Sequence, residues 1–437
     1  MRVTFLKSAG VVLESGATRL VCDPWLEDGA YYGAWAHVPP CTVTPEDLAP
    51  VHGIYITHIH PDHLHAASLA RFPRDVPVYV HRYAWTYLAD ELRRMGFTPV
   101  ELANGETAEV GNLALTIYAA DFCDPAVCGR FFGCDAYVGA PRPGSTQIDS
   151  LAVVTDGAHT VVNVNDCPVG LAQHAAPDIL TRFGRPDFLL VNYVGAGPYP
   201  QCMVALTEAE RLVKAAAKRE QFLRQAQDFI ELFRPRAFLP FAGTYTLVGR
   251  LARLNPFRGC PTQREAADVL GHRIPWARAV YLDSGQTYDL ASGAVTGEPC
   301  GWTDADCRAY ERDVLAHRRL DYEDEPEPGR VVLLQLLDVA RRRFLARCEA
   351  TGFRTETRVY VDLGESCYRL ADGALVAHET ARTEPHLVIG TDPRLLVWLL
   401  TGRAHWGDAS IGSHLTFERR PDVFERGLYF CLDDLHV

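Results

Sequence analysis

The sequence predicts an α/β fold in which short strands form sheets that are covered by helices. Residues 1–120 contain several short apolar runs separated by Gly, Pro and Asp turns, with helical patterns near 61–71 and 83–95. Further strand patterns are expected at 113–118, 150–155, 160–164, 187–192, 236–240, 358–363, 367–370 and 386–390. Strands that alternate with helices in this way are typical of layered α/β proteins.

A long helix is expected over 208–233. Thr207 is a suitable N-cap and Glu210 occupies the capping-box position. Apolar residues share one face of this helix, and basic residues including Lys214 and Lys218 lie away from most of that face. The basic face is interpreted as solvated, with a phosphate-binding ridge as the alternative.

An acidic, proline-bearing stretch at 321–329 is the best candidate for a linker. It divides the chain into a catalytic domain over 1–320 and a smaller C-terminal α/β module over 330–437. The module begins with an apolar helical pattern at 331–350.

Composition excludes several classes of function. The net charge of -12 disfavours binding to nucleic acid or to an anionic membrane. No stretch reaches the roughly 18 apolar residues that span a bilayer, and the N-terminus lacks a signal-peptide pattern. The 13 cysteines are scattered, which favours reduced thiols and a cytoplasmic location. The sequence makes no prediction of oligomeric state.

The most informative motif places four potential metal ligands within six residues: His58, His60, Asp62 and His63. They follow the strand-like run 51–56, so several donors are delivered to one point at the end of a strand. Imidazoles and carboxylates at this density suit first-row transition metals, and their two-plus-two grouping suits a pair of ions. A histidine-rich surface turn is the weaker interpretation.

The motif resembles the signature of the metallo-β-lactamase superfamily, which implies an αββα sandwich. A narrower likeness is carried by Asp23-Pro24-Trp25-Leu26 with Gly33-Ala34-Trp35 and Pro39-Pro40. This pattern is similar to the catalytic part of the CMP-N-acetylneuraminate hydroxylase family, which are iron-dependent monooxygenases. Further similar segments are 54–58, 162–167, 239–243, 411–415 and 419–422.

The resemblance implies that His58 and His60 bind one metal and that Asp62 and His63 bind the other. Asp166, at the end of the strand pattern 160–164, matches the carboxylate that bridges the two ions. Asp62 and Asp166 are therefore also the candidate catalytic residues. An Asx turn or a cap is the structural alternative for Asp166.

The third ligand position departs from the superfamily pattern, because no histidine follows the strand at 113–118. Asp121 is the nearer candidate in strand register, and Asp124 fits the position where the hydroxylase family has a histidine. Phe241-Ala242-Gly243 also stands where a second-metal histidine is typical. Fewer imidazoles and more carboxylates favour iron or manganese over zinc, and oxidation over hydrolysis.

The sequence therefore predicts a non-haem di-iron oxygenase that acts on a polar small molecule with dioxygen, in bacterial specialised metabolism. No Rieske iron–sulfur motif occurs in the chain, so electrons are expected from a separate electron-donor protein, from the substrate itself or from a small reductant. The alternatives are a zinc or manganese hydrolase of a lactone, amide or phosphodiester, and an inactive binding protein. Trp25, Trp35 and His37 are candidate substrate contacts, or they cover the sheet edge.

Overall fold

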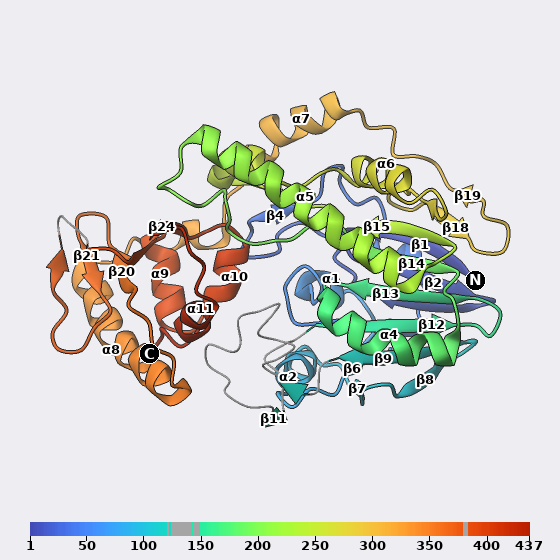
Figure 1. Ribbon diagram of the computed structural model, residues 1–437, viewed down its shortest axis with the longest axis horizontal. Coiled ribbons are helices and arrows are strands. Elements are labelled where there is room, and N and C mark those ends of the chain that lie inside the picture. The colour runs from blue at the N-terminus through green and yellow to red at the C-terminus, as the bar shows by residue number, and fades with distance from the viewer. Residues whose placement is uncertain (120–121, 124–141, 144–148, 379–382) are drawn as a thin grey trace.

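The computed structural model describes residues 1–119, 122–123, 142–143, 149–378 and 383–437. Two mixed sheets face each other and carry helices on their outer faces, so the larger part of the chain is an αββα sandwich (Figure 1). A smaller mixed sheet with its own helices forms the C-terminal part, in orange and red. The predicted fold class is confirmed.

The first sheet has the order β19-β18-β1-β2-β3-β5-β6-β7. Its strands are β1 (Arg2–Lys7), β2 (Gly10–Ser15), β3 (Thr18–Cys22), β5 (Gly53–Tyr55), β6 (Val78–His81), β7 (Pro99–Leu102), β18 (Thr287–Asp289) and β19 (Val295–Thr296). From β3 to β7 the strands run parallel, so β5 ends at the same edge of the sheet as its parallel neighbours.

The second sheet has the order β17-β15-β14-β13-β12-β9-β8. Its strands are β8 (Thr107–Val110), β9 (Leu113–Ala119), β12 (Ser150–Thr155), β13 (Thr160–Asn165), β14 (Phe188–Asn192), β15 (Ala237–Phe241) and β17 (Arg278–Ala279). The central strands β12 and β13 are buried along almost their whole length, and valine is their most frequent residue, as is typical of strands covered on both faces.

The C-terminal sheet has the order β22-β21-β20-β23-β24. Its strands are β20 (Arg358–Asp362), β21 (Cys367–Arg369), β22 (Ala377–His378), β23 (His386–Gly390) and β24 (Thr416–Arg420). Two short pairs, β4 (Trp35–Ala36) with β16 (Thr246–Leu247) and β10 (Phe122–Cys123) with β11 (Arg142–Pro143), complete the described strands.

Helices cover the outer faces of the sheets. In the sandwich they are α1 (Ala66–Ala70), α2 (Tyr87–Arg94), α4 (Val169–Phe183), α5 (Glu208–Phe233), α6 (Gln263–Arg273) and α7 (Asp304–Asp313); in the C-terminal part they are α8 (Arg330–Thr351), α9 (Pro393–Leu400), α10 (Trp406–Ile411) and α11 (Arg426–Leu432). The described 3-10 helices are η1 (Pro45–Leu48), η3 (Gly249–Phe257), η4 (Leu315–His317) and η5 (Asp321–Asp324).

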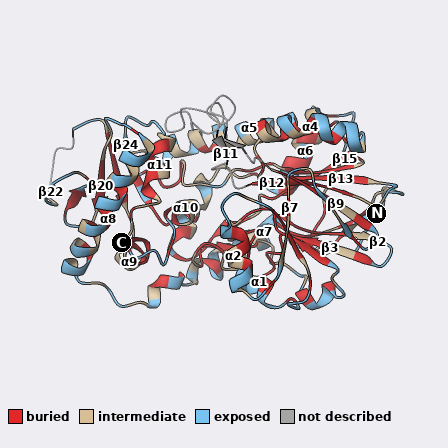
Figure 2. Cartoon of the chain, turned by 90° about the horizontal axis from the view of Figure 1, so that it is seen from below, coloured by how far each residue is buried: buried red, intermediate tan, exposed pale blue. Residues whose placement is uncertain are grey.

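The core divides into layers that follow this architecture. One apolar cluster fills the space between the two sheets, and a second lies between the first sheet and α1 and α2. A third and larger cluster lies beneath α4, α5 and α6 and continues into the C-terminal part, as the buried residues in Figure 2 indicate. The two parts therefore share one continuous apolar core.

The expected long helix and its cap are present. The Thr207 hydroxyl accepts a hydrogen bond from the Glu210 amide, and the Glu210 carboxylate accepts one from the Thr207 amide. Among the described helices, none combines the length and the apolar character that crossing a bilayer would require.

The segment expected to be a linker is partly built into the fold. Residues 321–324 form η5, and Tyr322 is fully buried. Its hydroxyl donates to Nδ1 of His414 at 2.9 Å and accepts from Arg250 at 2.7 Å. Tyr322 thus anchors the acidic segment between the two parts of the chain. The domain boundary proposed at 321–329 stays a prediction.

Candidate metal centre

The candidate ligands converge at one edge of the sandwich. The loop that carries His58, His60 and His63 follows β5, and Asp166 follows β13. Asp149 immediately precedes β12, which runs antiparallel to β13 and therefore begins where β13 ends. Three strand ends from two sheets thus deliver imidazoles and carboxylates to the same place.

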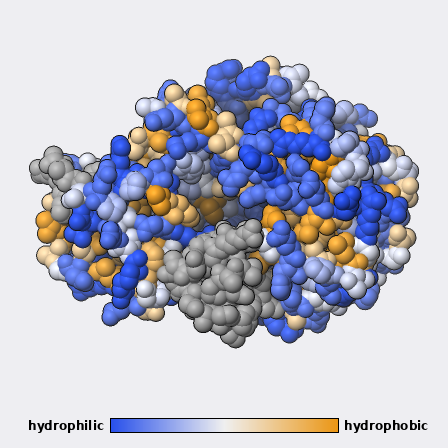
Figure 3. All heavy atoms as spheres, viewed as in Figure 1, coloured by the Kyte–Doolittle hydropathy of each residue, from blue (hydrophilic) through white to orange (hydrophobic). Residues whose placement is uncertain are grey.

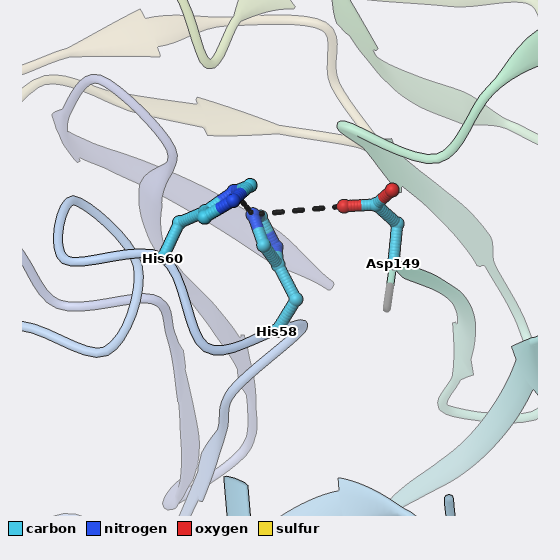
Figure 4. Close-up of side chains that lie close together, drawn as sticks. All are labelled: His58, His60 and Asp149. Carbon is cyan, nitrogen blue, oxygen red and sulfur yellow. Dashed lines mark hydrogen bonds and ion pairs between the residues drawn. The ribbon is translucent and has the colours of Figure 1, made fainter. Parts of the chain in front are cut away.

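The first group consists of His58, His60 and Asp149, shown in Figure 4. Nε2 of His58 lies 2.8 Å from Nδ1 of His60 and 3.6 Å from Oδ1 of Asp149. One ligand atom from each residue lies within 4.8 Å of the others. The side chains of His58 and Asp149 are buried, and that of His60 is half-buried.

The second group consists of His58, His63 and Asp166. Oδ2 of Asp166 lies 3.5 Å from Nε2 of His63 and 3.9 Å from Nε2 of His58. Oδ2 of Asp62 lies 3.4 Å from the same His63 nitrogen. The structure thus brings together all five of the described residues that the sequence proposed as ligands, and their ligation stays a prediction.

A second layer of side chains holds these residues in place. Asp23 contacts Nδ1 of His63 at 3.1 Å and accepts hydrogen bonds from the amide and hydroxyl of Thr57. With Nδ1 engaged, Nε2 of His63 is left to face the carboxylates of the site. Asn192 donates to Oδ1 of Asp166 at 2.7 Å, which turns Oδ2 toward the histidines. Such outer contacts orient metal ligands in proteins.

The electrostatics of the site suit a bound cation. Burial raises the pKa of Asp149 to about 8, and the negative charge of Asp166 adds to this effect. Burial and the neighbouring His63 and His60 hold the pKa of His58 well below its usual value, so its imidazole is neutral, as ligation requires. Crowded carboxylates beside a neutral imidazole are stabilised when a divalent cation lies between them. The residues present therefore fit a metal centre.

Asp149 was missed by the sequence reasoning. The search for a third ligand was limited to the end of the strand at 113–118, and its two candidates, Asp121 and Asp124, lie outside the described residues. In the structure, Ser150 of β12 pairs with Ala119 of β9. The start of β12 and the end of β9 therefore share one edge, and an aspartate just before an antiparallel neighbour was the signal that could have revealed it.

The three candidate substrate contacts are not at an accessible surface. Trp25, Trp35 and His37 are all buried. The Trp35 ring stacks on Tyr245 at 3.6 Å, and the His37 ring lies 3.9 Å from that of Trp25. These side chains are packed against other aromatic rings in this conformation, and a substrate role for them stays a prediction.

Comparison with known families agrees with the fold and with the motif. Residues 18–222, which include the histidine loop and Asp166, match the family described as the Beta-lactamase superfamily domain. The chain contains a metallo-β-lactamase superfamily domain. The clustered His and Asp side chains that could hold a metal ion include residues of this domain and lie at one edge of its metallo-β-lactamase fold.

Curated proteins with similar sequences match the chain over about 250 residues. A protein of Mycolicibacterium smegmatis named for a Rieske 2Fe-2S cluster is 29% identical over 252 residues, which cover 56% of this chain and 43% of the relative. The human inactive cytidine monophosphate-N-acetylneuraminic acid hydroxylase is 36% identical over 253 residues, 56% of this chain and 45% of the relative. The chain spans less than half the length of these relatives.

Two solved structures show a weaker likeness to the chain, a diiron beta-hydroxylase and a metallo hydrolase. CmlA, a diiron beta-hydroxylase from Streptomyces venezuelae, has a TM-score of 0.40 and 15% identity, covering 64% of this chain and 53% of its own. Igni18, a metallo hydrolase from Ignicoccus hospitalis, has a TM-score of 0.41 and 14% identity, covering 68% and 98%.

Proposed function

We propose that this protein is a non-haem di-iron oxygenase that oxidises a polar small molecule. The observation that carries the proposal is the donor set. Each of the two ligand groups contains two imidazoles and one carboxylate, with Asp149 in the first and Asp166 in the second. Two histidines and one carboxylate are the ligands of many non-haem iron(II) oxygenases, because they leave coordination positions open.

The two groups share His58, so their ligand atoms form one cluster that could hold two adjacent ions. Bound iron would supply the activation of dioxygen. The chain itself supplies the shape and charge of the site: Asp23 and Asn192 fix the ligand orientations, as described above. The Asp166 side chain is 31% exposed, whereas that of Asp149 is 11% exposed, so Asp166 borders the path by which a substrate would approach.

The names of curated relatives support oxidative chemistry. They include hydroxylases of cytidine monophosphate-N-acetylneuraminic acid and proteins named for a Rieske cluster. Because the chain spans less than half of those relatives, their substrates are not transferred to it. An electron donor carried outside the metallo-β-lactamase domain would complete the reaction, and a cytoplasmic location is part of the same proposal.

A metal-dependent hydrolase is the second candidate, and Asp62 favours it. Burial alone would raise the pKa of this carboxyl, but His63 and the Tyr31 hydroxyl lower it to about 2. Asp62 therefore stays ionised at neutral pH and could accept a hydrogen bond from the attacking water during hydrolysis of a lactone, amide or phosphodiester. Zinc or manganese would be the metal in this case.

The test is to load the metal-free chain anaerobically with iron(II) or with zinc and to add a reductant and dioxygen. We expect dioxygen consumption only with iron. Asp149→Asn should lower both the iron content and the rate of consumption at least tenfold, whereas the matched control Asp268→Asn, at an exposed position on α6, should change neither. Hydrolysis of lactone or phosphodiester substrates by the zinc form under anaerobic conditions, without iron-dependent dioxygen uptake, would reject the oxygenase.

A further inference from the structure

Helix α5 carries basic residues of two kinds. Lys214 forms an ion pair with Asp422 at 3.3 Å, and Arg219 forms one with Glu265 at 3.6 Å. Arg211 and Lys218, on the same helix, have no carboxylate within ion-pair distance among the residues that the structure describes. In a chain with 55 acidic and 43 basic side chains, most cations can find a partner. Neither residue has such a partner, although the Arg211 guanidinium lies over the Phe257 ring, 4.7 Å from its centroid.

Arg211 and Lys218 both point at the loop that precedes α5. The Lys218 ammonium donates to the carbonyl of Tyr199 at 2.9 Å, and the Arg211 guanidinium donates to the carbonyl of Gln201 at 3.5 Å. The two residues are seven positions apart, which is close to two helical turns, so they lie on one face of α5. This face is near the N-terminal end of α5, which extends toward β24 of the C-terminal sheet (Figure 1).

A third cation comes from the segment after η3. Gly259 lies so close to α5 that a Cβ atom there would be 2.5 Å from the carbonyl oxygen of Ala215. Ala215 is on the turn between Arg211 and Lys218. The glycine thus allows a close approach that brings Arg258, its neighbour, to the same turn of the helix. Arg258 also has no carboxylate partner among the described residues; its guanidinium donates to the carbonyl of Tyr245.

The environment of these cations differs from that of a solvated basic surface. Arg211, Lys218 and Arg258 are all half-buried. Nε of Arg211 and Nε of Arg258 are buried and have no hydrogen-bond partner. Burial, together with the charge of Arg258, lowers the pKa of Lys218. Half-buried cations that are grouped without a carboxylate nearby repel one another, and a bound anion would relieve that repulsion.

We propose that Arg211, Lys218 and Arg258 form a binding site for a phosphate-type oxyanion, either free phosphate or the phosphate group of a larger molecule. Two guanidinium groups match the tetrahedral oxygens of phosphate through paired N–H donors, and the lysine adds a point charge. This anion site is built from α5 and the 258–260 segment, and it includes none of the candidate metal ligands. It does not depend on the proposed oxygenase activity.

The test measures phosphate binding to the full chain by titration calorimetry and by thermal unfolding, with chloride at matched ionic strength as the reference. We expect phosphate to bind and to raise the unfolding midpoint. Lys218→Met and Arg211→Met should weaken binding at least tenfold. The matched controls Lys214→Met and Arg219→Met remove cations from the same helix that already have carboxylate partners, and they should bind phosphate like the wild type.

The same variants identify the source of the phosphate group. Flotation with vesicles of phosphatidylcholine containing phosphatidic acid, compared with phosphatidylcholine alone, tests a lipid headgroup. Binding to either source that is lost in Lys218→Met and Arg211→Met, and kept in the controls, supports the site. Binding to neither source, or equal loss in all four variants, overturns it. If Lys218→Met does not fold, the proposal is decided by comparing phosphate binding to Arg211→Met with phosphate binding to the wild type.

Discussion

The hydroxyl of Tyr31 donates a 2.6 Å hydrogen bond to Oδ1 of Asp62. Tyr31 has a left-handed backbone conformation, with φ of 54°, and its carbonyl accepts a 2.8 Å hydrogen bond from Nε2 of His414. His414 lies between α10 and β24, so the C-terminal part of the chain holds the tyrosine that orients a carboxylate of the candidate metal centre. These two hydrogen bonds connect the C-terminal part of the chain to the candidate metal centre.

Replacing Tyr31 with phenylalanine should weaken metal binding without abolishing the fold. The change removes the donor to a buried carboxylate, which we expect to destabilise the metal-free protein by about 1.5–3 kcal/mol. Loss of such an outer contact lowers metal affinity by about 10–100-fold. Metal titration and chemical denaturation measure the two effects.

Tyr32→Phe is the matched control for this prediction. The Tyr32 hydroxyl accepts a hydrogen bond from the amide of His405, in the C-terminal part. Its loss should reduce stability and leave metal affinity unchanged. An equal loss of metal affinity in both variants would show that Tyr31 acts through general stability and does not orient Asp62.

His414 should make the stability of the metal-free protein fall on acidification. Burial lowers the pKa of this imidazole to about 4, against about 6.5 in the unfolded chain. Between these values the unfolded state binds the extra proton, so the free energy of unfolding decreases as the pH falls from 6.5 to 4, by up to about 3 kcal/mol. Denaturation curves across this range test the prediction.

His414→Gln should reduce the slope of that pH dependence, because the titrating group is removed. The control His272→Gln replaces an exposed histidine on α6 and should keep the slope of the wild type. An unchanged slope in His414→Gln would mean that other buried groups carry the acid sensitivity.

Asp149→His should shift the metal preference from iron toward zinc. The change converts the first ligand group from two imidazoles and a carboxylate to three imidazoles, a donor set typical of zinc. Competition of equimolar iron(II) and zinc for the metal-free variant, read by elemental analysis, should show a larger share of zinc than in the wild type. The same ratio in both proteins would argue against Asp149 as a ligand.

Removal of metal should lower the thermal stability of the chain. A ligand that binds only the folded state stabilises it by about 2.7 kcal/mol at a concentration 100 times its dissociation constant. Treatment with a chelator should therefore lower the unfolding midpoint, and iron(II) should restore it, whereas magnesium should not. A midpoint that is insensitive to the chelator in metal-loaded protein would contradict a metal held by these residues.

The sequence predicted the fold and the histidine loop because both depend on local patterns. His58, His60, Asp62 and His63 are adjacent in the chain, and the strand before them is apolar. Asp166 was proposed because it follows the strand pattern 160–164, where the superfamily resemblance implies a bridging carboxylate. These features need no knowledge of how distant segments pair.

Asp149 and His414 could not be assigned in this way. The role of Asp149 depends on the antiparallel pairing of β12 with β9, which aligns the beginning of one strand with the end of another. His414 reaches Tyr31 across 383 positions of sequence. Trp25 and Trp35 were proposed to contact substrate because aromatic residues near a metal loop suit either a pocket or a core, and only the packing shows that they are buried.

Anaerobic titration of the metal-free chain with iron(II), in the wild type and in His58→Ala, tests the central claim most directly. His58 is the one residue common to both ligand groups. We expect the wild type to bind two iron ions per chain and His58→Ala to lose both, with the fold retained by circular dichroism. Equal iron binding by the folded variant and the wild type would contradict the assignment of this cluster as the metal centre.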